Sequence, residues 1–347
     1  MSLRARAAAL LATAVLASAL LPAATASAAP PVTLRPDAAA AGWLAGQLVD
    51  GDHLESSFGG VSYPDQGLTV DAVLAFAAAE VSDDAAARAT AWLARPANLA
   101  GYAGDGAGES YAGATAKLAF AAEVRGADPA AFGGVDLVAR LRALQQPSGR
   151  FSDLSQWGDY SNSLGQSYAL LALARTPGGA PAAAVGFLAG AQCADGGFPV
   201  AFGQPVCTAD PDATALAAQA LAATGRGAAA RAGLSWLVAH QGADGSLAAA
   251  GAAAGNANST GLAAQALLTG GRPVAGVRAW GFVHSLQAGC GAPAADRGAV
   301  AYDATGLDPA TAPRATAQAV LGLSGAPLAG LSAHGARAAA PVLACTH

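Results

Sequence analysis

The chain has 347 residues, of which 53% are hydrophobic and 12% are charged, and its formal net charge at pH 7 is −5. A hydrophobic fraction of this size excludes intrinsic disorder, because the chain can bury a substantial core. The acidic balance also argues against a nucleic-acid partner, because phosphate recognition needs a basic surface.

The first 28 residues have the layout of a secretory signal peptide. Two arginines precede an apolar run from Ala7 to Leu21, and Ala26 to Ala28 supply the small residues of a cleavage site. The run is short for a membrane span, which needs about 20 apolar residues. We therefore expect a signal peptide over residues 1–28, one domain over residues 29–347, and a secreted, extracellular protein without a membrane span.

The remaining sequence repeats with a period of 46 to 50 residues. The motif Gln-x-x-x-Gly recurs at Gln47–Gly51, Gln145–Gly149, Gln192–Gly196, Gln241–Gly245 and Gln287–Gly291, with a degenerate copy at Ala97–Gly101. A large apolar residue lies four or five positions before each copy: Trp43, Trp92, Leu141, Phe187, Trp236 and Phe282. Their apolar neighbours recur at helical spacing, which predicts an amphipathic helix that ends at the glycine.

A loop follows each glycine, and a second motif, [Asp/Asn]-x-[Asp/Asn/Ser/Gly]-x-[Thr/Ser], follows the loop. Its copies are Asp65–Thr69, Asp159–Ser163, Asp210–Thr214 and Asn256–Thr260, with a weaker copy at Tyr111–Thr115. Each copy opens an Ala/Leu-rich segment that is apolar nearly all round, which indicates a helix buried on every side and capped by the motif's polar residues. We predict that these helices start near Gln66, Tyr111, Asn162, Asp212, Asn258 and Pro313.

Each repeat is therefore predicted to contain one half-exposed helix, one loop and one enclosed helix. A unit of this size cannot bury its own apolar surface, so the copies must stack. Six copies could form an open solenoid or a ring. The enclosed helices favour a ring, that is, an all-α fold of the α/α toroid type with twelve main helices in six hairpins.

The four cysteines, Cys193, Cys207, Cys290 and Cys345, suggest two disulfides in an exported chain, and three pairings are open. Cys193 and Cys207 flank the loop between one outer helix and its inner partner, so we expect this pair to close. Cys290 would then pair with Cys345. None of the cysteines has the close paired spacing of a zinc site, and we expect no metal and no cofactor.

Gln-x-x-x-Gly-x-aromatic, as in Gln192–Phe198 and Gln145–Phe151, resembles the repeat of squalene and terpenoid cyclases and of protein prenyltransferase β subunits. The resemblance covers essentially residues 29–347 and implies an α/α toroid. Class II cyclases carry Asp-x-Asp-Asp-Thr-Ala at the start of one inner helix, and the middle aspartate protonates the substrate. The matching stretch is Asp210–Ala215, in which Asp212 falls on the proton donor and Ala213 replaces the last aspartate.

Zinc-dependent prenyltransferases, by the same resemblance, place Asp-x-Cys near this position and a histidine on the last inner helix. Asp212 stands where that cysteine would be, and the segment Thr316–Leu323 contains no histidine. The resemblance therefore does not predict zinc chemistry here.

Two interpretations of Asp210 and Asp212 compete. Two carboxylates near an apolar cavity could share a proton, which would raise one pKa into the range of a general acid. However, Asn256 and Asn258 occupy the same positions 46 residues later, which favours repeated helix capping for both pairs.

The candidate ligand contacts are two aromatic residues and four amides, namely Tyr160, Phe198, Asn162, Asn258, Gln219 and Gln265. We expect non-catalytic binding of a small apolar or isoprenoid-like ligand, or of a cell-surface partner, at the toroid mouth. The alternative is a divergent class II terpenoid cyclase with Asp212 as general acid. A third interpretation is a purely structural role in the cell envelope.

Overall fold

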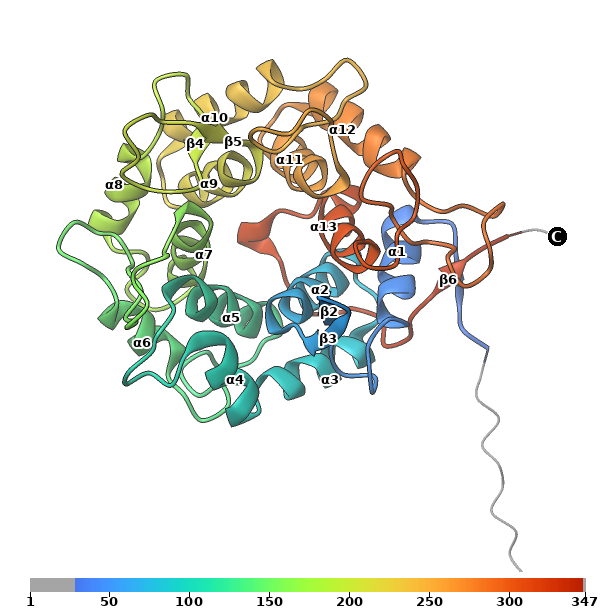
Figure 1. Ribbon diagram of the computed structural model, residues 1–347, viewed down its shortest axis with the longest axis horizontal. Helices are drawn as coiled ribbons and strands as arrows, with labels where there is room; N and C mark the ends of the chain where they lie inside the picture. Colours follow the sequence, from blue (N-terminus) through green and yellow to red (C-terminus); the bar gives the residue numbers. More distant parts are fainter. Residues whose placement is uncertain (1–28, 346–347) are drawn as a thin grey trace, which may run out of the picture.

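The computed structural model describes residues 29–345, so the predicted signal peptide lies outside the described residues. Two concentric layers of helices form a ring (Figure 1), and thirteen α-helices lie within the described residues. The predicted all-α toroid is therefore confirmed. None of the helices in residues 29–345 is long and apolar enough to cross a membrane.

Six inner helices surround the axis of the ring. They are α2 (Gln66–Ala79), α5 (Ala112–Val124), α7 (Ser163–Ala174), α9 (Pro211–Ala223), α11 (Ala257–Thr269) and α13 (Ala312–Ser324). Each starts within one residue of its predicted position. The ring is closed because α13 packs against α11 on one side and against α2 on the other.

Seven further helices lie outside this layer: α1 (Pro36–Ala45), α3 (Asp83–Leu93), α4 (Pro96–Ala103), α6 (Leu137–Ala143), α8 (Ala182–Gly190), α10 (Gly227–Ala239) and α12 (Pro273–Ser285). Six are the predicted outer partners of the hairpins. The additional helix is α4, which forms in the degenerate second repeat, where Pro96 supplies a favourable first helical residue.

The glutamine of the first motif links neighbouring repeats. Gln192 donates from Nε2 to the carbonyl of Gly196 at 2.7 Å and to that of Ala229, in the next outer helix, at 2.9 Å. Gln241 makes the same pair of bonds to Gly245 and Ala275. The motif therefore stabilises the stacking of repeats, which is why it recurs with the period of the fold.

The glycine of the first motif has a steric role. Gly245 has a φ of +92°, and a Cβ atom there would lie 2.3 Å from the carbonyl oxygen of Arg278 in α12. In the last repeat the predicted glycine, Gly291, has no such neighbour, whereas Gly298 has a φ of +97° and would place a Cβ atom 2.5 Å from the carbonyl oxygen of Ala39. The assignment of Gly291 was therefore wrong, because this repeat carries a longer loop between its glutamine and its glycine.

The threonine of the second motif ties the loop to the inner helix that follows it in four repeats, through Thr69, Thr214, Thr260 and Thr316. Thr214 Oγ1 accepts a hydrogen bond from the backbone N–H of Phe198 at 2.9 Å, and Thr260 Oγ1 accepts one from Leu247 at 2.9 Å. In the third repeat, Gln166 Oε1 accepts the equivalent bond from Phe151. The motif in that repeat is therefore Asn162–Gln166, three residues after its predicted position.

The chain after α13 closes one end of the ring. The short helix η1 (Leu328–Gly330) lies at the C-terminal ends of the inner helices, with Leu328 and Leu331 buried. The segment then passes the end of α5, where the N–H of Ala333 donates to the carbonyl of Val124 at 2.8 Å. Figure 1 shows this segment in red across the centre of the ring.

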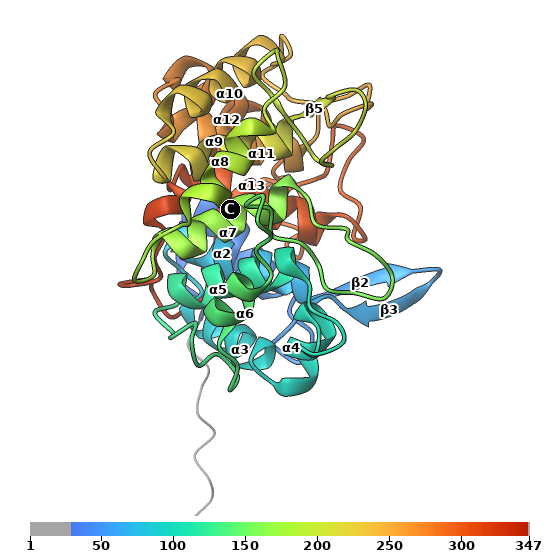
Figure 2. The ribbon, with the colours of Figure 1, turned by 90° about the vertical axis from the view of Figure 1, so that its left-hand side faces the viewer.

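The strands are short and form three two-stranded sheets. Strand β1 (Val32–Thr33) pairs in parallel with β6 (Val342–Leu343), which joins the two ends of the described chain. Strands β2 (Glu55–Phe58) and β3 (Val61–Pro64) form an antiparallel hairpin that projects from the ring (Figure 2). Strands β4 (Phe198–Pro199) and β5 (Ala209–Asp210) lead into α9.

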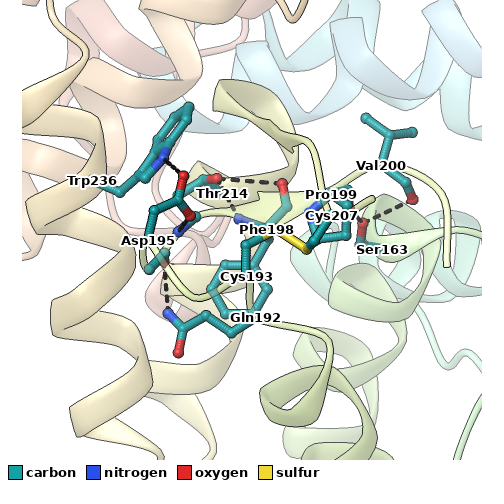
Figure 3. Close-up of a disulfide and its surroundings, with 12 residues drawn as sticks. Ser163, Gln192, Cys193, Asp195, Phe198, Pro199, Val200, Cys207, Thr214 and Trp236 are labelled. Atoms are coloured by element: carbon teal, nitrogen blue, oxygen red, sulfur yellow. Dashed lines mark hydrogen bonds between the residues drawn. A yellow bond between two sulfur atoms is a disulfide. The ribbon is translucent and has the colours of Figure 1, made fainter. Parts of the chain in front are cut away.

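Both predicted disulfides are present. Cys193–Cys207 closes the loop that carries β4, and Cys290–Cys345 attaches the C-terminal segment to the loop after α12. Figure 3 shows the first disulfide beside Phe198 and Thr214. Ser163, at the start of α7, donates from Oγ to the carbonyl of Val200 at 2.9 Å, so this loop also connects α7 with α9.

Candidate functional site

A cavity of about 580 Å³ lies on the axis of the ring, at the N-terminal ends of the inner helices. All six inner helices contribute to its wall, as do α4 and the loop before α7. The C-terminal segment closes the opposite end, so the cavity opens on one side only. Its volume lies within the range of roughly 300–1,000 Å³ that is typical of small-molecule sites.

Four tyrosines line the cavity: Tyr102, Tyr111, Tyr160 and Tyr168. Tyr168 is buried, and burial raises the pKa of its phenol, so it stays neutral. Tyr160 is 73% exposed and therefore stands at the mouth. Leu216, Leu262 and Leu321 add apolar surface.

Two ion pairs lie in the cavity wall. Lys117 Nζ contacts Asp71 Oδ1 at 2.6 Å, and Arg314 Nη2 contacts Asp65 Oδ2 at 2.8 Å. Although burial lowers the pKa of Lys117, the opposing charge of Asp71 outweighs that effect and its pKa is raised overall. Lys117 therefore remains charged, and both cationic groups are already paired with carboxylates.

Asp212 lies in the first turn of α9 and faces the cavity. Its Oδ1 atom is buried without a hydrogen-bond partner. Burial, and secondarily the nearby charge of Asp210, raise the pKa of Asp212 to about 6, against the smaller lowering effect of a side-chain hydrogen bond with Ser259. A carboxyl group with this pKa exchanges protons near neutral pH, which is the property required of a general acid.

Asp210 has a different role, because it is the N-cap of α9. Its Oδ1 accepts from the backbone N–H groups of Asp212 and Ala213 at 2.9 and 3.1 Å, and its Oδ2 accepts from Ala250. The capping interpretation therefore holds for Asp210. It was wrong for Asp212, which accepts no bond from the backbone of its own helix.

Four of the six predicted ligand contacts fall in three places. Tyr160 and Asn162 line the cavity, and Asn162 also caps α7 by accepting from Gly165. Phe198 is fully buried between α9 and the outer helix α10, so it is not part of the cavity wall. Asn258 is partly buried at the start of α11 and is not part of the wall.

The two predicted glutamine contacts lie at the closed end of the ring. Gln219 Oε1 accepts from the N–H of Leu328 at 3.4 Å, and Gln265 Nε2 donates to the carbonyl of Ala326 at 2.6 Å. Gln219 Nε2 also donates to Gln265 Oε1 at 3.3 Å. These amides hold the C-terminal segment, so neither of the two predicted contacts lies in the wall of the axial cavity.

Several wall residues were not among the candidates, in particular Tyr102, Tyr111, Lys117 and Arg314. Lys117 carried a usable signal, because it is the only lysine in the sequence and lies in the middle of an Ala-rich helix. Tyr102 had no such signal, since α4 belongs to the degenerate repeat. No group of three or more His, Cys, Asp or Glu side chains that could hold a metal ion is found between residues 29 and 345.

Comparison with known proteins shows the fold. No family model matches the chain, and no curated protein matches it. A crystal structure of a protein from Actinoplanes is similar, with a TM-score of 0.62 and 19% identity, over 84% of this chain and 99% of that one.

The apo structure of the type II terpene cyclase MstE from Scytonema is also similar, with a TM-score of 0.61 and 17% identity, over 83% of this chain and 96% of that one. A variant of MstE in complex with its substrate, geranylgeranyl dihydroxybenzoate, has a TM-score of 0.62 and 15% identity, over 84% and 97% of the two chains. The chain therefore has a terpenoid cyclase-like α/α toroid fold.

Proposed function

We propose that this protein binds a small, mainly apolar ligand of isoprenoid size in the axial cavity. The observation that carries the proposal is the cavity itself, which is open at one end, closed at the other, and lined by leucines and tyrosines. A compact alanine-filled axis would have favoured a purely structural role. The similar fold of MstE, which is described with a geranylgeranyl substrate, supports the size and class of the ligand.

Calorimetric titration with geraniol tests this proposal. Ala114 lines the cavity, and Ala114→Trp should fill part of it and weaken binding at least tenfold. Ala87, which is exposed on the outer helix α3, provides a matched control, and Ala87→Trp should bind as the wild type does. Equal affinity in all three proteins would place the ligand elsewhere and contradict the proposal.

A second candidate function is favoured by Asp212. Protonated Asp212 could transfer its proton to a terminal alkene, which would leave a tertiary carbocation for ring closure by the next double bond. Loss of a proton to water would end the reaction, so the product would be an isomer of the substrate. The unpaired Oδ1 atom and the raised pKa of Asp212 support this chemistry. The replacement of the last aspartate of the class II motif by Ala213 argues against this chemistry.

Incubation with squalene and with geranylgeranyl diphosphate distinguishes the two candidates. We expect no cyclic product by gas chromatography from the wild type. Cyclic product that the wild type forms and Asp212→Asn does not would show that the function is catalysis and not binding alone. Product that persists in the variant would exclude Asp212 as the acid.

We further propose that the protein is exported. The signal-peptide pattern over residues 1–28 supports this proposal, and the two disulfides are compatible with an oxidising compartment. N-terminal sequencing of the chain recovered from culture medium should give a start near Ala29. Full-length chain retained inside the cell would contradict export.

A further inference from the structure

The cations in the cavity wall are not free to bind an anion. Lys117 is paired with Asp71 at 2.6 Å, and Arg314 is paired with Asp65 at 2.8 Å and lies 4.0 Å from Asp71. A phosphate or carboxylate ligand would have to displace these carboxylates. Breaking the largely buried Lys117–Asp71 pair is costly, because it leaves the partner charge uncompensated. The Arg314–Asp65 pair is more exposed, so its displacement costs less.

The inner helix ends do not offer an anion site either, although all six point toward the mouth. A helix N-terminus binds anions through its free backbone N–H groups. Here, side chains at five of the six starts already accept from those groups: Asp65, Asp153, Asn162, Asp210 and Asn256. The backbone donors of these helices are therefore largely occupied.

Hydrogen-bond acceptors, in contrast, remain unused in the wall. Asp212 Oδ1 and Gln318 Oε1 are both buried without a partner, and both residues line the cavity. Asn258 Oδ1 is a third unpaired acceptor, at the same position in the neighbouring helix as Asp212. Buried acceptors of this kind are rare in folded proteins and need an explanation. A ligand that donates hydrogen bonds would supply one.

The charges and aromatic rings of the cavity wall also favour a ligand that donates hydrogen bonds, and in particular a cation. Three carboxylates, those of Asp71, Asp153 and Asp212, line the cavity with only two cations. The tyrosine faces add favourable sites for a cation. Lys117 Nζ already lies 5.8 Å from the centre of the Tyr168 ring.

We infer that the ligand carries a positively charged amine head at Asp212, with its apolar body against the leucines and tyrosines of the cavity. The inference rests on the proposed binding function and specifies the chemistry of its ligand. It also separates this site from one that accepts a prenyl diphosphate, because the head group that the wall favours has the opposite charge.

Three probes with the same ten-carbon chain test the inference: geranylamine, geraniol and geranyl diphosphate. Calorimetric titration of the full chain at pH 7.5 should show geranylamine binding at least tenfold more tightly than geraniol, and geranyl diphosphate binding most weakly. In Asp212→Asn the advantage of the amine over the alcohol should fall to less than threefold. Thermal unfolding of this variant checks that it remains folded.

The pH dependence provides a second readout. Asp212 lies near the charge of Asp210, the N-cap of its helix, and shares the cavity with Asp71, Lys117, Asp153 and Arg314. Because the pKa of Asp212 is about 6, wild-type affinity for the amine should fall between pH 7.5 and pH 5, whereas affinity for geraniol should not.

Equal affinities for all three probes, or tightest binding of the diphosphate, would overturn the amine inference and leave the binding function standing. Binding of none of the probes would overturn both. An amine preference that persists unchanged in Asp212→Asn and in Ala114→Trp would place the amine outside the cavity and overturn the inference.

Discussion

Gln287 donates from Nε2 to the carbonyl oxygen of Pro36 at 2.8 Å, across 251 residues of sequence. The same side chain also donates to Gly298 at 3.1 Å. Gln192 and Gln241 make the equivalent pair of bonds between consecutive repeats. The last repeat is therefore joined to the first outer helix by the interaction that joins neighbouring repeats elsewhere, and this interaction closes the ring.

Gln287→Ala should destabilise the ring. The substitution leaves two partly buried carbonyls without their donor, and we expect the free energy of unfolding to fall by about 1–3 kcal/mol. Urea denaturation measures this change. Gln204→Ala, at an exposed position, is the control and should change it by less than about 0.5 kcal/mol. Equal effects of the two substitutions would exclude a closing role for Gln287.

The two glycines of the last repeat should respond differently to alanine. Gly298→Ala introduces a Cβ atom 2.5 Å from the carbonyl oxygen of Ala39 at a φ of +97°, so we expect a loss of at least about 2 kcal/mol. A Cβ atom at position 291 would have open space around it, so Gly291→Ala should lower the free energy of unfolding by less than about 1 kcal/mol. The same denaturation experiment ranks the two. The reverse order would restore Gly291 as the motif glycine.

Sequence repetition predicted the fold because the repeated residues are those that make the contacts between repeats. Gln192 and Gln241 bridge outer helices, and Thr214 fixes a loop to an inner helix, so their period reports the period of the ring. The same reasoning could not predict the cavity wall. Lys117 and Tyr102 have no counterparts in the repeats and lie at positions that the motifs do not mark.

The repeat pattern could not predict the path of the C-terminal segment either. It carries no copy of either motif, and its path depends on contacts with parts of the chain that are distant in sequence. The bond between Leu328 and Gln219 spans 109 residues. For the same reason, the inner-helix glutamines were assigned to a ligand when they bind this segment.

Removal of the disulfides should have unequal effects. On the chain-entropy estimate, Cys290–Cys345, which spans 55 residues, contributes about 4 kcal/mol, and Cys193–Cys207, which spans 14, contributes about 3 kcal/mol. Paired Cys→Ser substitutions, followed by thermal unfolding, compare them. We expect loss of Cys290–Cys345 also to raise amide exchange in residues 325–343. Unchanged exchange there would show that the other contacts of the segment suffice to hold it.

Asp212 should make stability depend on pH. Its pKa in the folded chain is about 6, against an ordinary value of 3.8, so the folded state holds the proton more tightly than the unfolded state. The resulting stability is fully present below pH 3.8 and is lost as the pH rises through 6. Relative to wild type, Asp212→Asn should therefore be more stable at pH 8, by at most about 3 kcal/mol.

The difference in unfolding free energy between wild type and Asp212→Asn should shrink toward pH 4, where the wild-type carboxyl is also neutral. Glu123, whose pKa is raised to about 7 by burial at the other end of the ring, offers a comparison with the same sign. A difference that stays constant from pH 4 to pH 8 would show that Asp212 titrates normally.

Amide hydrogen exchange with and without saturating geraniol tests most directly whether the axial cavity is the ligand site. We expect protection of the mouth loop, residues 153–162, and of residues 102–114. The first range supplies the wall residues Asp153, Tyr160, Ser161 and Asn162, and the second supplies Tyr102, Tyr111, Gly113 and Ala114. The β2–β3 hairpin and the C-terminal segment should show no comparable change. Protection confined to the hairpin or to the C-terminal segment would contradict the account, as would unchanged exchange at the mouth while geraniol is bound.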